Sequence, residues 1–153
     1  HEHYDHVSGV NGNKAEYKIP LYASRACDEG MQSPARNRAK FFGAWLEVQG
    51  LSGQRVDQAY ACRADEIVEE GQTIDWMGHH IVLRLAPGHS AGSMLRKSVP
   101  ASRLPGSDPE AFQRSTLPQL KQLDGNMLVL PGHYGCFRLR DHHLLQVDKK
   151  ERD

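Results

Sequence analysis

A dense histidine motif opens the chain and constrains its fold more than any other feature. Residues 1–6 have the sequence HEHYDH, of the form H-x-H-x-D-H, in a chain with nine histidines. Alternate side chains of an extended stretch share one face, so His1, His3 and Asp5 are expected to converge while His6 turns elsewhere. Imidazole is the commonest nitrogen ligand of zinc. The motif therefore predicts a metal centre, in preference to a surface histidine cluster or a purification-tag remnant.

Two further histidines follow apolar segments that end in a Pro-Gly turn. The sequence Pro-Gly-His ends at His89 and again at His133, in each case directly after an apolar run, 81–85 and 126–130. Strand ends are rigid and the loops after them are open, so both positions suit a metal ligand. One Pro-Gly-His alone is a weak signal, but with the opening motif the two histidines join the candidate ligands.

Helix and strand signals alternate along the chain. Capping residues and apolar spacing predict helices over 24–31, 33–46 and 107–123, and apolar runs predict strands at 18–23, within 56–85 and at 126–130. Hairpin turns are expected at Glu70-Gly71 and Met77-Gly78, and Pro118 is expected to bend the last helix. The interleaving predicts an α/β or α+β class, with sheet layers covered by helices.

Composition and charge narrow the partners and the location. The 19 basic side chains cancel the 19 acidic ones, so charge gives no reason to expect binding to nucleic acid or to an anionic membrane. No stretch approaches the roughly twenty apolar residues that a membrane span needs, so a soluble protein is expected. Three widely spaced cysteines disfavour a disulfide framework and favour a cytoplasmic protein. We expect a small-molecule substrate and leave open whether the protein is a homodimer.

Taken together, these motifs resemble the metallo-β-lactamase superfamily, most closely its glyoxalase II-like, generic metal-hydrolase branch. Segments 70–74 and 104–111 are similar to the same branch. The resemblance implies one αββα sandwich domain over 1–153, with a binuclear site at one edge. By position, the first metal would be bound by His1, His3 and His89, and the second by Asp5, His6 and His133. Two zinc ions are the expected cofactors, with iron or manganese as other options.

The sequence departs from the superfamily pattern in two places, so the expected sandwich is incomplete. The pattern has several strands before its H-x-H-x-D-H loop, and none precedes His1. It also has a strand and a Gly-Asp turn between its two Pro-Gly-His motifs, and that aspartate bridges the metals. Here Met94 runs straight into Leu95, so about a dozen residues are expected to be absent, either left out or truly deleted. Asp108, in a Ser-Asp-Pro-Glu helix start, is expected to be a first-turn residue that faces the helix dipole rather than a replacement for that ligand.

Hydrolysis is the chemistry that the resemblance implies. A metal ion lowers the pKa of bound water toward about 7, so that a metal-bound hydroxide can attack a thioester, a lactone or a related ester or amide. Asp5 is the predicted catalytic residue, which orients the nucleophile or takes its proton. Two alternatives stay open. One is a mononuclear iron enzyme of the persulfide dioxygenase type, and the other is a degenerate, non-catalytic domain.

Overall fold

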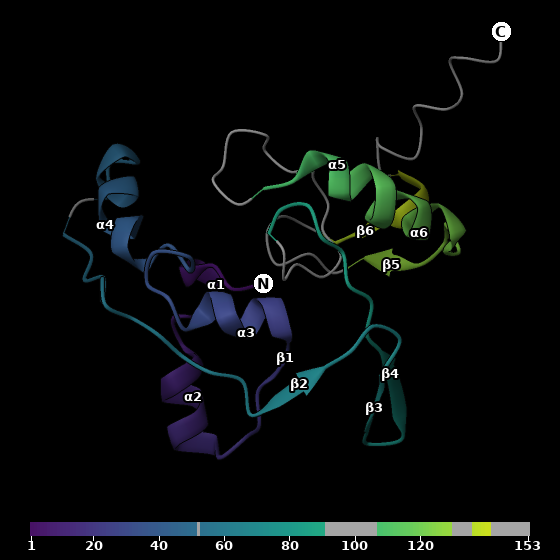
Figure 1. The fold of residues 1–153 in the computed structure, drawn as a ribbon, viewed down its shortest axis with the longest axis horizontal. Helices are drawn as coiled ribbons and strands as arrows, with labels where there is room; N and C mark the ends of the chain where they lie inside the picture. Colours follow the sequence, from purple (N-terminus) through teal and green to yellow (C-terminus); the bar gives the residue numbers. More distant parts are fainter. Residues whose placement is uncertain (52, 91–106, 130–135, 142–153) are drawn as a thin grey trace, which may run out of the picture. The chain divides into compact units, whose positions relative to one another are not determined.

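The computed structural model describes residues 1–51, 53–90, 107–129 and 136–141 (Figure 1). The chain divides into two compact units, His1–Leu85 and Ala86–Asp153. Both units contain helices and strands, which confirms the expected mixed class. That residues 1–153 form a single domain stays a prediction. Among the described residues, no helix has both the length and the apolar character needed to cross a membrane.

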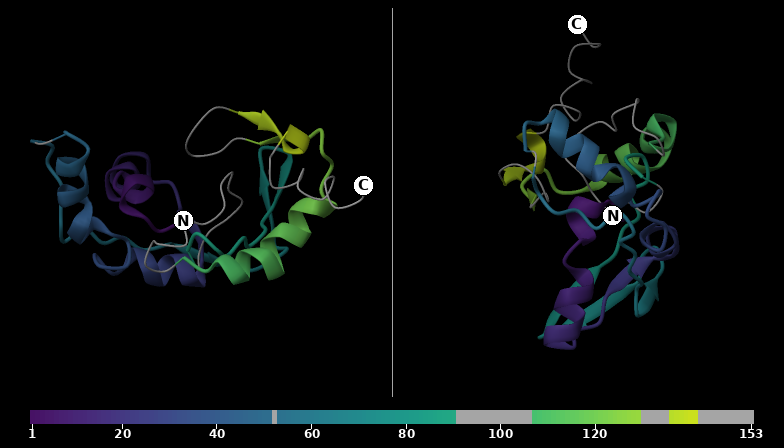
Figure 2. Two further views of the ribbon diagram at one scale, coloured as in Figure 1. Left: turned by 90° about the horizontal axis from the view of Figure 1, so that it is seen from above. Right: turned by 90° about the vertical axis from the view of Figure 1, so that its left-hand side faces the viewer.

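The first unit begins with helices and continues into short strands, which Figure 2 shows from two further directions. Its elements in order are α1 (Tyr4–Val7), α2 (Val10–Tyr17), β1 (Tyr22–Ser24), α3 (Arg25–Met31), α4 (Ala39–Val48), β2 (Glu66–Val68), β3 (Thr73–Trp76) and β4 (His79–Val82). Strands β1 and β2 pair in parallel, with Ala23 opposite Ile67. The expected strand over 18–23 therefore begins late, because Lys18 ends α2 in a left-handed conformation.

Helix α3 confirms the expected N-cap. Ser24 has extended backbone angles, and its hydroxyl accepts a hydrogen bond from the Cys27 N–H at 3.3 Å, which satisfies one of the free donors of the first turn. The helix ends at Met31, as the sequence predicts. It leads directly out of β1, so the side chains of its buried face are positioned by the parallel pair.

Strands β3 and β4 form the hairpin that the Met77-Gly78 turn predicts. Both turn residues have positive φ, 48° and 81°, as a two-residue type I′ turn requires. The hairpin is antiparallel, with Trp76 opposite His79. The other expected hairpin, at Glu70-Gly71, does not form, because β2 pairs with β1 instead of β3.

The helix expected over 33–46 begins only at Ala39. Residues before it form turns, and Arg38 has a left-handed backbone with φ of 70°, which a helix cannot include. The side chain of Asn37 accepts a hydrogen bond from the Ala39 N–H at 2.8 Å and so provides the cap that the sequence places four residues earlier.

A small apolar core and one buried amide hold the first unit together. The core residues are Val7, Ala23, Cys27, Met31, Ala39, Tyr60 and Cys62. Asn37 is fully buried, and its amide nitrogen donates to the carbonyl oxygens of Met31 at 3.1 Å and of Tyr60 at 2.8 Å. Burial raises the pKa of the Cys27 thiol to about 11, and it raises that of Cys62 as well. All three cysteines are free thiols.

The second unit is built on one interrupted helix and a short strand pair. Its elements are α5 (Pro109–Ala111), the π-helical turn η1 (Phe112–Thr116), α6 (Leu117–Gln122), β5 (Leu128–Val129), β6 (Phe137–Arg138) and the 3₁₀ turn η2 (Leu139–Asp141). Strands β5 and β6 are antiparallel, and Phe112, Leu120 and Leu139 form the core. The helix expected from Ser107 begins at Pro109, and Asp108 is its N-cap instead of the expected first-turn residue, because its side chain accepts from the Ala111 N–H at 2.9 Å.

Replacement of Asn37 by alanine should destabilise the protein by about 2–4 kcal/mol. The change leaves the Tyr60 carbonyl and the Ala39 N–H without their side-chain partner, while the Met31 carbonyl keeps the Cys62 N–H at 3.2 Å. A buried unsatisfied group costs roughly 1–3 kcal/mol. Urea unfolding followed by circular dichroism measures the difference. Asn13→Ala, on the exposed surface of α2, is the matched control, and equal midpoints for the two variants would contradict the role given to Asn37.

Asp65 should make the stability of the first unit depend on pH in the acid range. A hydrogen bond from the Lys14 ammonium at 2.8 Å, followed by one from the Leu21 N–H, lowers the pKa of its carboxyl. At pH values above the unfolded-state pKa of about 3.9, the lowered pKa of Asp65 stabilises the folded state. This contribution is lost as the pH falls through the pKa of the folded state.

The measurement compares the unfolding free energies of the wild type and Asp65→Asn at pH 7 and at pH 3. We expect the wild type to be more stable at pH 7 and the difference to shrink at pH 3. Glu16→Gln, an exposed position on α2, should show no such change. A difference between wild type and Asp65→Asn that is as large at pH 3 as at pH 7 would rule out this ion pair as the source.

Candidate metal centre

The opening motif is part extended and part helical. His3 has extended backbone angles, φ −64° and ψ 145°, and α1 begins at the next residue. The His3 carbonyl accepts from the N–H groups of His6 at 2.9 Å and Val7 at 3.2 Å, which begins the helical turn. Strand-like alternation therefore applies to His1 and His3 but not to Asp5, which lies in the helix.

The three imidazoles of the motif lie against one another. The ring centroids of His1 and His3 are 4.6 Å apart in an edge-to-face arrangement, and those of His1 and His6 are 4.1 Å apart. His6 was expected to turn elsewhere, but the helical turn returns its ring to His1. The Asp5 carboxylate lies 3.6 Å from His6 Nε2. The motif thus gathers three nitrogen donors and one carboxylate within six residues.

Contacts from α3 and from the turn before α4 hold residues 1–4, which contain His1 and His3, in place. Glu2, between the first two histidines, is buried and packs on Gly30 of α3, where an added Cβ would lie 2.6 Å from Glu2 Cγ. The Tyr4 N–H donates to the Asn37 carbonyl at 2.7 Å. Arg38 Nε donates to His3 Nε2 at 3.0 Å. These supporting residues were missed from the sequence, where only the glycine inside a helix could have indicated a close approach.

Tyrosines and neighbouring aromatic rings support the other side of the motif helix. The Tyr4 ring packs against Phe42 and Tyr60, with centroids 5.1 Å and 5.5 Å away. The Tyr60 hydroxyl donates to the Val7 carbonyl at 2.5 Å, and burial raises its pKa to about 12. A neutral hydroxyl is therefore kept as a hydrogen-bond donor to the end of α1 throughout the physiological range.

His89 follows a buried loop of the second unit. Residue 88 has φ of 143°, which favours glycine, and the Gly88 carbonyl accepts from the Asp108 N–H at 2.7 Å. His89 and Ser90 are both buried. The Pro-Gly turn expected at the end of the apolar run is thus present, and it places His89 in a restrained segment. His133, the other Pro-Gly-His histidine, lies outside the described residues, as do Met94 and Leu95.

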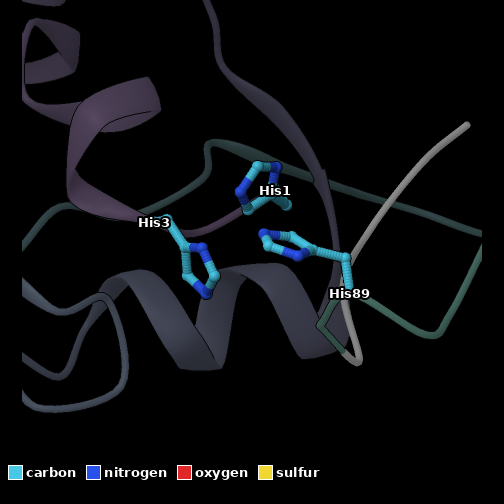
Figure 3. Close-up of side chains that lie close together, drawn as sticks. All are labelled: His1, His3 and His89. Carbon is cyan, nitrogen blue, oxygen red and sulfur yellow. The ribbon is translucent and has the colours of Figure 1, made fainter. Parts of the chain in front are cut away.

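Among the described residues, one group of side chains meets the geometric requirements of a metal site. His1, His3 and His89 each offer a ring nitrogen, and these atoms lie within 4.8 Å of one another (Figure 3). Three imidazoles suit zinc or iron. Asp5 and His6 are not in this group.

Comparison with known proteins defines the fold. No family model matches the sequence, and no curated protein matches it. Among solved structures, the fold is of the metallo-β-lactamase type, as the sequence predicts. The B3 metallo-β-lactamase BLEG-1 is similar with a TM-score of 0.74 and 19% identity, over 95% of this chain and 74% of that one.

A second solved structure supports the same fold. TTHA1623 in a di-iron-bound form is similar with a TM-score of 0.64 and 23% identity, over 96% of this chain and 71% of that one. Identities this low concern the fold alone. The finer resemblance to the glyoxalase II-like branch therefore stays a prediction.

Removal of an imidazole from this group should reduce metal binding. We expect His3→Ala to weaken zinc affinity by roughly 100-fold or more, because even changes behind a ligand cost 10–100-fold. Chelator competition gives the affinity and elemental analysis the metal content. His79→Ala, on the exposed hairpin, is the control with an equal loss of one histidine. If both variants retained the same zinc affinity, the group would not be a metal site.

Proposed function

We propose that this protein is a metal-dependent hydrolase that acts on a small-molecule, carbonyl-type substrate such as a thioester, a lactone or a related ester or amide. The observation that carries the proposal is the group formed by His1, His3 and His89 in a fold of the metallo-β-lactamase type. The balanced charge of the chain gives no support to nucleic acid or a membrane as partner. We propose the cytoplasm as its location, on the basis of the reduced cysteines.

The proposed ligands divide into two sets. His1, His3 and His89 would bind one metal ion, and Asp5, His6 and His133 a second. Zinc is our first choice, and the di-iron form of TTHA1623 makes iron the principal alternative. When bound, the metal supplies Lewis acidity, which polarises a carbonyl oxygen and makes water acidic enough to react near neutral pH.

The protein's own side chains would supply the remaining requirements of hydrolysis. Asp5 lies on the exposed side of α1, where its carboxylate can orient the attacking water and accept its proton. His3 is buried, so a metal bound to it would be shielded from bulk water on that side. The hydrogen bond from Arg38 to His3 Nε2 would open when a metal binds, because a neutral imidazole has a single acceptor nitrogen. A shielded side and an open side are what a catalytic metal site needs to bind both the metal and a substrate.

The test is turnover by the full chain, loaded separately with zinc, iron and manganese, on a thioester, a lactone and a chromogenic β-lactam. We expect hydrolysis of at least one, its loss on chelation and its return when metal is added back. Asp5→Asn should lower kcat by about 100-fold or more, the usual size of a general-base contribution. Glu47→Gln, an exposed carboxylate of α4, should leave kcat unchanged.

Other outcomes would identify the two alternatives. One iron per chain, with oxygen consumed in the presence of a persulfide, would replace hydrolysis by the dioxygenase reaction. A folded chain that binds no metal would instead be a non-catalytic domain. A metal-loaded chain that hydrolyses none of the three substrates would contradict the proposed reaction while leaving the metal centre in place.

A further inference from the structure

The helical segment formed by α5, η1 and α6 contains a π-helical turn, which has one more residue than an α-helical turn. Leu117 N–H bonds to the Phe112 carbonyl, five residues back instead of four, and Pro118 follows without an N–H to donate. One residue corresponds to about 100° of rotation in a helix, so the insertion changes which side chains face inward. Single π-helical turns of this kind are frequent at functional sites.

Thr116 is the last residue of this π-helical turn, and its hydroxyl leaves the helix to bind a loop. The side chain is 1% exposed, and its Oγ1 donates to the Pro87 carbonyl at 2.8 Å. A helical threonine more often donates to the carbonyl four residues back. A hydroxyl has one proton, so the bond to Pro87 takes the only donor of Thr116.

The same loop receives a second hydrogen bond from the beginning of the helix. The Asp108 N–H donates to the Gly88 carbonyl at 2.7 Å, while the Asp108 side chain caps α5. Two consecutive carbonyls immediately before His89 are thus held by one helical segment. Residue 88 is a glycine with φ of 143°, and a glycine backbone is otherwise the least restricted. These two bonds therefore restrict the peptide units from which the His89 side chain projects.

We propose that Thr116 is a positioning residue of the metal centre, which fixes the direction of the His89 ring by holding the Pro87 carbonyl. The inference rests on the proposed function, because it requires His89 as a ligand. Metal ligands must be held to within about 0.5 Å of their productive positions, and a glycine-containing loop does not provide this alone. Thr116 acts through His89 and needs no contact with metal or substrate.

Three variants of the full chain test this inference. Thr116→Val keeps the shape and removes the hydroxyl, Thr116→Ser keeps the hydroxyl, and Ser115→Ala removes a neighbouring hydroxyl that accepts from Gln119 at 3.5 Å. The readouts are zinc affinity by chelator competition and the visible spectrum of the cobalt-loaded protein, which reports ligand geometry. We expect Thr116→Val to bind zinc 10–100-fold more weakly with an altered cobalt spectrum. Thr116→Ser and Ser115→Ala should both resemble the wild type.

The outcomes separate this inference from the proposed function. A wild type that binds zinc, with Thr116→Val equal to it in affinity and cobalt spectrum, overturns the role of Thr116 alone. A wild type that binds no zinc overturns the metal centre and the inference together. If Thr116→Val does not fold, Thr116→Ser and Thr116→Ala make the same comparison, because they differ only in the hydroxyl. Equal affinity in that pair overturns the inference.

Discussion

The buried amide of Asn37 is the interaction on which the first unit depends. Its side chain binds the end of α3, the carbonyl of Tyr60 and the first N–H of α4, and its backbone carbonyl accepts from Tyr4 in the histidine motif of residues 1–6. A buried amide must satisfy its donors and its acceptor, so these segments are held in one arrangement. Because the apolar core around it is small, the buried amide of Asn37 specifies the packing more sharply than the apolar residues do.

The contacts of Asn37 also support residues 1–4, which contain the first two histidines. This segment lies against α3, where Gly30 leaves space for the side chain of Glu2. Arg38, which is held in a left-handed conformation next to Asn37, donates to His3. A positive φ is costly for a residue with a side chain, and such residues persist where their surroundings require them. The left-handed backbone of Arg38 brings its guanidinium within hydrogen-bonding distance of the buried His3 ring.

The second unit restrains its histidine by different means. Backbone and side-chain donors of one helical segment bind the carbonyls of a short loop, and the π-helical turn gives Thr116 its inward direction. Pro118 suggests from the sequence that the helix is irregular, but not that the irregularity begins before it or which side chain it redirects. A helix start within residues 107–110 was predictable because a polar capping residue followed by a first-turn proline is a local signal, although the cap is Asp108 and not Ser107.

Local signals account for what the sequence determined: the histidine motif of residues 1–6, the N-cap at Ser24, the helix start within residues 107–110, and the Met77-Gly78 hairpin. The fold type was also predictable, since widely separated motifs of a characteristic form resemble one superfamily. The parallel pairing of β1 with β2, the late start of α4 and the return of the His6 ring to His1 were decided by tertiary structure. Each depends on contacts between residues distant in sequence, or on a helix boundary that such contacts shift, and neither composition nor periodicity encodes these.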